Sequence, residues 1–170
     1  MEAEGSVDFG AFVAATQGRL QRTAWLLTGN WEEAEDLVQT ALAKAWRHWD
    51  RVVTADSPEA YARRILSNSF LSSRRRRWWG ERPVSEVEPV PSGDQSEQVA
   101  LRAAIEAGLK QLTARQRAAV VLRYFSDLSE AEVAEIMHCR VGTVKSTTAR
   151  AFELLRAQPG FDGLLREAHL

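Results

Sequence analysis

The sequence predicts an all-α protein built from two small helical domains joined by a flexible linker. Apolar residues recur at spacings of three and four along nearly all of the 170-residue chain, which is the helical period. Residues 80–95 break that period with three prolines and two glycines, as linkers do. Residues 127–156 combine a capped short helix, a tight turn and a polar-faced helix, the pattern of a helix-turn-helix. We therefore expect domains at 1–79 and 96–158, and a tail at 159–170.

The first domain begins with two short predicted helices and a longer third one. The first surrounds Phe9 to Thr16, and the second runs from Leu20 to Leu27 and stops at Gly29. Asn30 can cap the free amides of the third helix, where Asn is a favoured residue. The third helix carries a broad apolar stripe of Ala34, Leu37, Val38, Ala41, Leu42, Ala45, Trp46 and Trp49. A loop is expected over residues 50–56.

The fourth predicted helix starts with Ser57, Pro58 and Glu59. Ser suits the cap, Pro suits the first helical position because its missing amide is not needed there, and an acid suits the first turn. The helix should run into the arginines at 74–77.

The second domain should contain four helices. The first spans residues 96–112, and capping-box patterns at Thr113 and Ser129 open the next two. The last helix begins at about Val141 and should bury Val144, Thr148, Ala151, Phe152 and Leu155. His138 lies in the preceding turn, where a left-handed conformation suits His better than most residues.

Charge is unevenly distributed along the chain, although the net charge is only -1. Residues 1–50 hold eight acids and four bases, whereas residues 60–82 hold seven arginines and one acid. Such patches, and not the overall pI, indicate contact with nucleic acid. Trp78 and Trp79 adjoin the arginine run and favour a contacting surface over a solvated tail.

Two features could suggest enzymatic or metal chemistry, and neither supports it. His138 and Cys139 are adjacent in one turn, which rarely supplies a coordination sphere. The acids of residues 32–36 occupy a helix start, where carboxylates favour the helix dipole. No phosphate-binding glycine loop or nucleophile motif occurs. We expect no catalytic residues, no metal and no cofactor.

The chain also lacks the features of an exported or membrane protein. Cys139 is the only cysteine, so no disulfide forms within the chain. The first residues are acidic and contain no apolar signal core. No apolar stretch approaches the length that crosses a bilayer. We expect a cytoplasmic protein without membrane insertion.

The outer face of the last helix suits DNA. Arg150 can contact guanine with both guanidinium nitrogens or hold phosphate, and Lys145 supplies a point charge for phosphate. Ala149 is small enough to let the helix approach closely. An ordinary solvated helix remains the alternative interpretation of this face.

Three stretches, in this order, give the chain its resemblance to a known family. They are residues 33–46 (EAEDLVQTALAKAW), 57–77 (SPEAYARRILSNSFLSSRRRR) and 112–155, which includes GTVKS. Together they resemble the extracytoplasmic-function (ECF, group 4) sigma factors of the sigma-70 family, in which a region 2 domain is joined to a region 4 helix-turn-helix domain. The pair Arg63 and Arg64, with Asn68 and RRRRWW, is most similar to the actinobacterial SigE-like branch.

The resemblance implies an alternative sigma factor, whose partners are core RNA polymerase, promoter DNA and an anti-sigma factor. The polymerase contacts would be the β′ clamp helices and, through the first helices of region 4, the β flap. The β′ contact would use Glu35, Asp36 and Gln39. The -10 element would be bound by Arg51, Val52, Val53, Thr54, Asn68, Arg74, Arg75, Arg76 and Arg77. The -35 element would be bound by Arg140, Thr143, Lys145, Ser146, Thr147, Ala149 and Arg150.

The chain departs from the family pattern at several of these positions. Thr40 replaces the usual acid after Gln39, and Thr147 replaces a common Arg. Arg140 stands where a Ser usually caps the last helix, a change that costs about 1 kcal/mol of helix stability. The promoter sequence therefore cannot be transferred from a relative.

Two other functions remain possible at this stage. A LuxR-like regulator would bind duplex DNA alone, but it would carry a receiver or ligand domain before the helix-turn-helix, and residues 1–79 show no strand-helix alternation. A sigma-like decoy that titrates an inhibitor would keep its apolar surfaces and lose its DNA contacts, which the retained Arg and Lys residues argue against.

Overall fold

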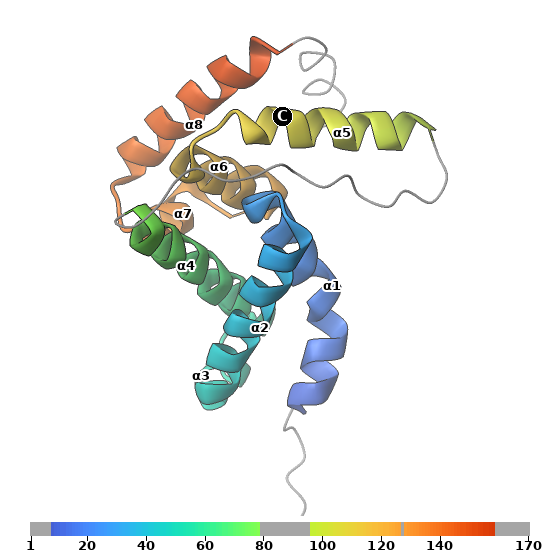
Figure 1. Ribbon diagram of the computed structural model, residues 1–170. Coiled ribbons are helices and arrows are strands. Elements are labelled where there is room, and N and C mark those ends of the chain that lie inside the picture. Colours follow the sequence, from blue (N-terminus) through green and yellow to red (C-terminus); the bar gives the residue numbers. More distant parts are fainter. Residues whose placement is uncertain (1–7, 79–95, 127, 159–170) are drawn as a thin grey trace, which may run out of the picture.

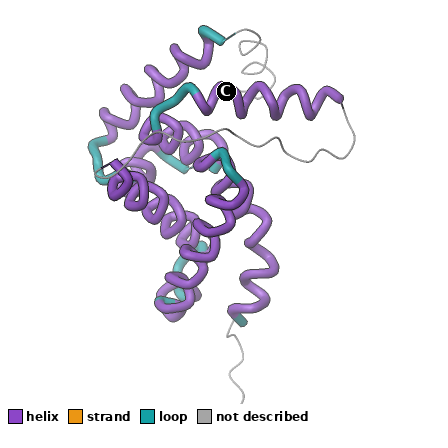
Figure 2. Tube along the Cα trace, in the orientation of Figure 1, coloured by secondary structure: helices purple, strands orange, loops and turns teal. Residues whose placement is uncertain are grey.

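The computed structural model describes residues 8–78, 96–126 and 128–158, with backbone only at 75–78 and 96–102. The helices are α1 (Phe9–Thr28), α2 (Trp31–Arg47), α3 (Trp49–Val53), α4 (Pro58–Trp78), α5 (Ser96–Lys110), α6 (Ala114–Val120), the π-helical turn η1 (Val121–Phe125), α7 (Glu130–Ile136) and α8 (Val141–Arg156). None of the described residues forms a strand (Figure 2). The predicted all-α class is confirmed, while the predicted linker and tail lie outside the described residues.

The prediction of two short helices at the start of the chain is wrong, because α1 is one continuous helix. Gly18 lies within it and is exposed. Glycine in a helix costs roughly 1 kcal/mol relative to alanine. The buried stripe of Phe12, Thr16 and Leu20 on either side keeps the helix continuous, as tertiary packing commonly does. The helix ends at Gly29, whose φ of 70° suits glycine at a helix C-terminus.

The start of α2 is as predicted, and its end is not. The Asn30 side chain accepts a hydrogen bond from the Glu33 amide at 2.9 Å. Trp46, expected in the buried stripe, is 61% exposed. The residues expected to form a loop at 50–56 instead mostly form α3, because Val52 is fully buried and anchors a helical turn there.

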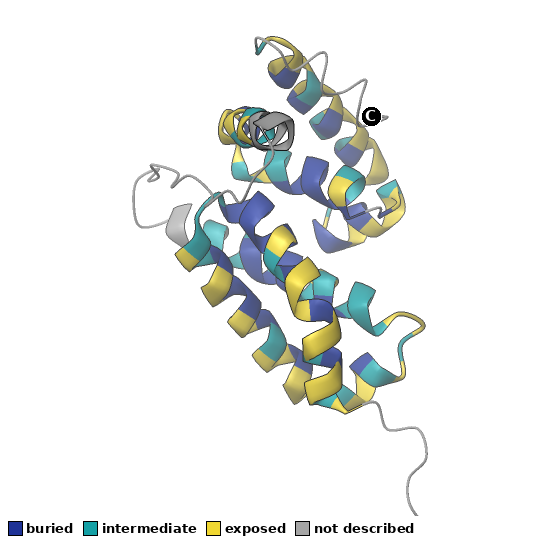
Figure 3. Ribbon diagram, turned by 90° about the vertical axis from the view of Figure 1, so that its right-hand side faces the viewer, coloured by how far each residue is buried: buried dark blue, intermediate teal, exposed yellow. Residues whose placement is uncertain are grey.

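The first helical unit comprises α1 to α4, and the second comprises α5 to α8. Helix α4 is the central element of the first unit. Its start is capped as predicted, since the Ala60 amide donates to the Ser57 hydroxyl at 3.2 Å. Leu66 and Phe70 on α4 are buried in one apolar cluster with Leu20 and Leu27 of α1 and with residues of α2. Figure 3 shows the buried residues of these helices turned inward and the exposed ones outward.

The second unit contains both predicted capping boxes. The Gln116 amide donates to the Thr113 hydroxyl, and the Glu132 amide donates to the Ser129 hydroxyl, each at 3.2 Å. The Gln116 and Glu132 side chains complete the boxes, because they accept hydrogen bonds from the backbone amides of Thr113 and Ser129. The sequence pattern therefore located the beginnings of α6 and α7 correctly.

The last helix also follows the prediction. Val144, Thr148, Ala151 and Leu155 are buried. Phe152 is only half-buried and packs edge-on against Tyr124, with ring centroids 4.9 Å apart.

The two helical units pack directly against each other, an arrangement that the sequence did not predict (Figure 1). One apolar cluster runs from the first unit into the second, where it includes Leu109, Leu112, Val120 and Val121. The Arg117 guanidinium spans the junction and donates to the Leu27 carbonyl at 3.3 Å and to the Leu109 carbonyl at 2.8 Å.

We expect Ser129→Ala to lower the free energy of unfolding by about 1 kcal/mol at neutral pH, the usual contribution of an N-cap. Hydrogen bonds from Ser129 hold the pKa of the Glu132 carboxyl below its ordinary value. A carboxyl with a lowered folded-state pKa stabilises the fold above its unfolded pKa, and this contribution disappears as the pH falls through the folded value. The difference between wild type and Ser129→Ala should therefore shrink below about pH 4, measured by urea unfolding. Ser146→Ala is the control, and an equal loss in both variants would contradict the assignment.

Candidate polymerase and nucleic-acid interface

The exposed side of α8 brings together the residues expected to contact duplex DNA. Lys145, Ser146, Ala149 and Arg150 are exposed, while Thr143 and Thr147 are half-buried. The Lys145 ammonium lies 3.5 Å from a carboxylate oxygen of Glu130. Both side chains of this pair are substantially exposed, so the pair contributes little and leaves Lys145 available to a phosphate.

The turn before α8 fixes the direction of that helix. His138 takes the predicted left-handed conformation, with φ of 50°, and the Cys139 amide donates to the Ala134 carbonyl at 2.9 Å. Arg140 occupies the N-cap position with extended backbone and makes no side-chain capping bond. Its exposed side chain therefore stands free at the positive end of the helix.

The residues expected to bind the -10 element lie in two places. Arg51 and Thr54 are exposed at the end of α3, and Val53 is half-buried. Val52 was expected in this contact surface, but it is fully buried and belongs to the core. The expectation that Val52 lies on the DNA surface is therefore wrong, because burying an apolar side chain is more favourable than leaving it in water.

The second part of this surface lies on α4. Asn68 is half-buried, and its side-chain oxygen is buried without a hydrogen-bond partner among the described residues. Arg74 forms an ion pair with Glu33 at 2.9 Å and lies over the Phe70 ring. Residues 75–77 continue the helix, but their side chains lie outside the described part. Arg74 is thus tied to its own domain, which the arginine run alone did not reveal.

The exposed side of α2 carries the expected polymerase contacts. Glu35, Asp36 and Gln39 are all exposed and lie on one side of the helix by their spacing. Trp46 lies on the same side, seven residues after Gln39, and contacts Phe9 with ring centroids 4.9 Å apart. Sequence periodicity assigned Trp46 to the core. One feature of the sequence could have indicated that Trp46 is exposed. It follows the polar Gln39 by seven residues, or about two helical turns, so the two residues lie on the same side of α2.

A groove opens on the other side of the molecule, where α1, α5 and η1 meet. Its volume is about 730 Å³, and its lining includes Gly18, Trp25, Trp31, Ile105 and Phe125. The Trp25 and Trp31 rings are stacked with centroids 5.7 Å apart. Both indole N–H groups are buried without an acceptor among the described residues. The groove is therefore largely apolar, although Gln17, Gln21 and Arg22 also line it, and the two indole N–H groups are covered by protein.

One buried charge lies at the junction of the two units. Burial, the largest cause, and the positive charge of Arg74 together lower the pKa of Arg117 to about 10, while the negative charge of Glu33 acts in the opposite direction. Arg117 therefore stays charged at neutral pH. Its hydrogen bonds to backbone carbonyls are stronger than those of a neutral donor, because the donor is charged.

In the described residues, no three His, Cys, Asp or Glu side chains are grouped to hold a metal ion. Within the same ranges, no helix has the length and apolar character needed to cross a bilayer.

Family models match both helical units. Residues 12–80 match the model of sigma-70 region 2, and residues 102–155 match that of sigma-70 region 4. The first match covers the part of the chain in which a LuxR-like regulator would have carried a receiver or ligand domain.

Individual relatives agree with these models. The RNA polymerase sigma-E factor of Streptomyces avermitilis is 37% identical over 162 residues, covering 92% of this chain and 88% of the relative. The same-named factor of Streptomyces coelicolor is 35% identical over 157 residues, covering 89% of this chain and 86% of the relative. These matches confirm the predicted similarity to SigE-like factors.

Solved structures share the arrangement of the helices. The sigma factor RpoE of Bartonella quintana, crystallised with the anti-sigma factor NepR, is 30% identical with a TM-score of 0.69, covering 94% of this chain and 97% of that one. The ECF sigma factor SigJ of Mycobacterium tuberculosis is 26% identical with a TM-score of 0.64, covering 88% of this chain and 53% of that one.

We expect Arg140→Ser to stabilise the protein by about 1 kcal/mol, because Ser at an N-cap satisfies an amide that Arg140 leaves without a side-chain partner. Chemical denaturation of the two proteins measures the difference. Arg115→Ser, at an exposed site inside α6, is the control and should not stabilise. An unchanged midpoint for Arg140→Ser would show that the first turn of α8 gains nothing from a cap.

Proposed function

The chain belongs to the sigma-70 family as an ECF-type RNA polymerase sigma factor that directs promoter recognition, and we propose which of its surfaces perform each step. The observation that carries the proposal is that the expected contact residues lie on three separate surfaces, on α2, on α3 with α4, and on α8. As a sigma factor the protein is a transcription initiation factor and not an enzyme. Its proposed place of action is the cytoplasm, where bacterial polymerase meets the chromosome.

The α2 face is proposed to bind the β′ clamp helices of core RNA polymerase. Glu35, Asp36 and Gln39 supply charge and hydrogen bonds, and Trp46 supplies an exposed aromatic ring two turns further along. Protein interfaces take much of their binding energy from a few residues, and tryptophan is prominent among them. We propose that the first helices of region 4, α5 and α6, contact the β flap.

The surface at α3 and α4 is proposed to bind the -10 element. Arg51, Val53 and Thr54 lie at one end, and Asn68 with residues 74–77 lie along α4. Extracting a base from the duplex costs a few kcal/mol, so a surface that binds the unstacked base lowers the free energy of promoter opening. The amide of Asn68 can donate and accept hydrogen bonds, as a base edge requires.

The outer side of α8 is proposed to bind the -35 element in the major groove. Arg150 lies more than two turns into the helix and can reach a base edge with its planar guanidinium. Lys145 is nearer the helix start and is proposed to hold phosphate, together with Arg140. Thr143, Ser146 and Thr147 add hydroxyl groups, and Ala149 permits close approach.

We also propose that an anti-sigma factor holds the protein inactive by inserting an apolar helix face into the groove between α1, α5 and η1. The relative RpoE was crystallised with such a factor. The groove has the apolar lining of Trp25, Trp31 and Phe125 that a helix-in-groove contact uses. If the Trp25 and Trp31 rings shift on binding, their indole N–H groups, which are covered in the free chain, would donate to a partner's carbonyl or carboxylate oxygens.

Transcription in vitro tests the overall assignment. Purified core polymerase should transcribe a subset of genomic fragments only when this protein is added. Absence of any such transcript would contradict the proposed surfaces as well as their roles.

Asp36→Arg should weaken binding to core polymerase at least about tenfold, because it reverses the charge in the middle of the α2 face. Fluorescence titration of labelled protein with core enzyme measures the affinity. Asp56→Arg makes the same charge change at an exposed site off that face, and it should bind core normally. Equal affinities for both variants and wild type would remove α2 from the interface.

Arg150→Ala should cost roughly 1–3 kcal/mol in promoter binding and relax the preference at one -35 position. Lys145→Ala should weaken binding to all promoters about equally. It should also reduce the salt dependence of binding by the amount expected for about one lost phosphate contact. Both variants are compared in holoenzyme against a library of -35 sequences at two salt concentrations. If Lys145→Ala changes the sequence preference and Arg150→Ala does not, the two roles are reversed.

Gly18→Leu should block the anti-sigma partner without harming the fold. A Cβ at position 18 meets no atom within 4 Å, and leucine favours a helix more than glycine does. The partner is defined as the protein that co-purifies with tagged wild-type chain from its own cells. Gly18→Leu should lose it, whereas Ala15→Leu, on the exposed side of α1 outside the groove, should keep it. Retention by both variants would place the partner elsewhere.

A further inference from the structure

Four aromatic side chains meet where the start of α1 lies beside the end of α2 and the start of α3. The Phe9 ring contacts both Trp46 and Trp49, with centroid distances of 4.9 Å and 5.1 Å. The Trp49 ring in turn lies 5.2 Å from the ring of Phe12, which is buried in the apolar core. Phe9 therefore connects the exposed Trp46 ring to the interior of the protein.

Trp46 is 61% exposed, more than any other large apolar side chain in the described part of the chain. A single exposed apolar residue is common on protein surfaces and needs no special explanation. Trp46, however, lies on the side of α2 that carries Glu35, Asp36 and Gln39, by its seven-residue spacing from Gln39. It therefore continues the surface that is proposed to bind core polymerase.

The first turn of α1 has little local chemistry to hold it. Asp8 occupies the N-cap position without a capping bond from its side chain, and no acid follows in the first turn. Gly10 comes next after Phe9, and glycine is a poor helix former. The ring contacts of Phe9 therefore supply the tertiary packing that keeps this turn in place.

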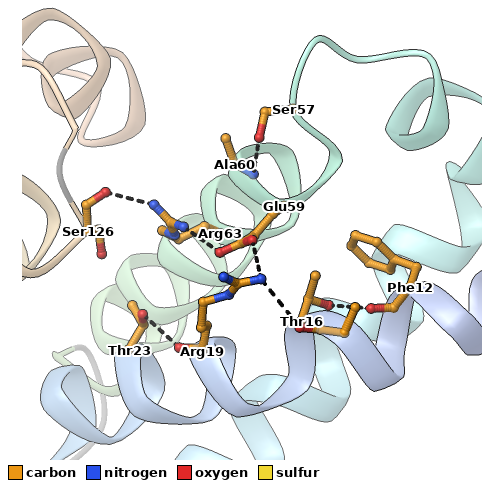
Figure 4. A network of polar contacts seen from close by, with 10 residues as sticks. Phe12, Thr16, Arg19, Thr23, Ser57, Glu59, Ala60, Arg63 and Ser126 are labelled. Carbon is orange, nitrogen blue, oxygen red and sulfur yellow. Dashed lines mark hydrogen bonds and ion pairs between the residues drawn. The ribbon is translucent and has the colours of Figure 1, made fainter.

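Farther along, α1 is fastened to α4 by polar contacts as well as by its core (Figure 4). The Arg19 guanidinium lies 3.0 Å from the carboxylate of Glu59, which also accepts a hydrogen bond from Arg63 at 2.8 Å. The Thr16 hydroxyl donates to the Phe12 carbonyl at 2.8 Å. Removing the Phe9 ring should thus loosen the start of α1 and leave the remainder of the helix in position.

We propose that Phe9 is a positioning residue of the polymerase interface, which holds the exposed Trp46 ring ready to enter an apolar pocket of the core enzyme. This inference rests on the proposed role of α2 in binding polymerase. A side chain that is already held in its bound orientation loses less conformational entropy on binding. The start of α1 thereby takes part in polymerase binding through Trp46, without a polymerase contact of Phe9 itself.

A double-mutant cycle tests whether Phe9 acts through Trp46, with affinity for core polymerase measured by fluorescence titration. Trp46→Ala should weaken binding at least about thirtyfold, as expected for a tryptophan that carries much of an interface. Phe9→Ala should weaken binding roughly two- to tenfold, the range that a lost aromatic contact accounts for. In the Trp46→Ala background, the same Phe9→Ala change should have an effect of less than about twofold, because coupled residues are not additive.

Two further variants separate positioning from a general loss of stability. Phe9→Tyr keeps the ring and should bind core polymerase like the wild type. Val13→Ala shortens a half-buried side chain one turn further along α1, which packs against the same core, and removes no ring contact. It should also bind normally, and circular dichroism checks that each variant is folded.

Fluorine NMR of protein labelled with 5-fluorotryptophan reports on the Trp46 ring itself. The Trp46 signal is the one missing from the spectrum of Trp46→Phe. Phe9→Ala should shift this signal, because the neighbouring ring is lost, whereas Val13→Ala should leave it in place. An unmoved Trp46 signal in Phe9→Ala would contradict the ring contact on which the proposal depends.

The binding results also separate this proposal from the one on which it rests. Normal affinity of Trp46→Ala, together with weakened binding of Asp36→Arg, would overturn the role of Trp46 and leave the α2 interface standing. Normal affinity of both variants would remove α2 from the interface altogether. Equal losses from Phe9→Ala with and without Trp46 would show that Phe9 acts independently of Trp46, and the positioning role would fail.

Discussion

Helix α4 must pack on two sides at once, and the rest of the structure depends on how it does so. Leu66 and Phe70 are buried in the same cluster as Leu20 and Leu27 of α1, while Leu71 faces the second unit. Each buried side chain of this size contributes roughly 1.5–3 kcal/mol. A helix with apolar contacts on both sides holds two units together and leaves little of its own surface free.

Arginine serves two different purposes in this molecule. Arg63, Arg74 and Arg117 are partly or largely buried and donate to Glu33, Glu59 or backbone carbonyls, so their guanidinium groups shape the protein. Arg51, Arg140 and Arg150 are exposed, and they are the arginines that we propose contact phosphate or bases. Local sequence cannot separate these groups, because the distinction depends on which carboxylate or carbonyl lies within about 3 Å.

The conflict between stability and function is visible at Arg140 and Asn68. At the first, the helix start lacks a side-chain cap, and an exposed cation stands on the surface that is proposed to bind DNA. At the second, a buried amide oxygen has no hydrogen-bond partner within the described part of the chain, on a surface that is proposed to bind an unstacked base. Departures from local optimisation of this kind are expected where a surface is kept for a ligand.

Sequence alone determined the helical class, the caps at Asn30, Ser57, Thr113 and Ser129, and the buried and exposed sides of α8. These features depend on neighbours within four residues, so periodicity and capping chemistry are sufficient to predict them. The exposed set on α2 followed for the same reason, although its role rested on family resemblance. Tertiary structure alone decided that α1 is continuous, that Val52 is buried and Trp46 is not, and that Arg74 is paired. It also decided that the two units close on α4. Each of these outcomes depends on contacts between residues distant in the chain, which hydrophobic spacing does not encode.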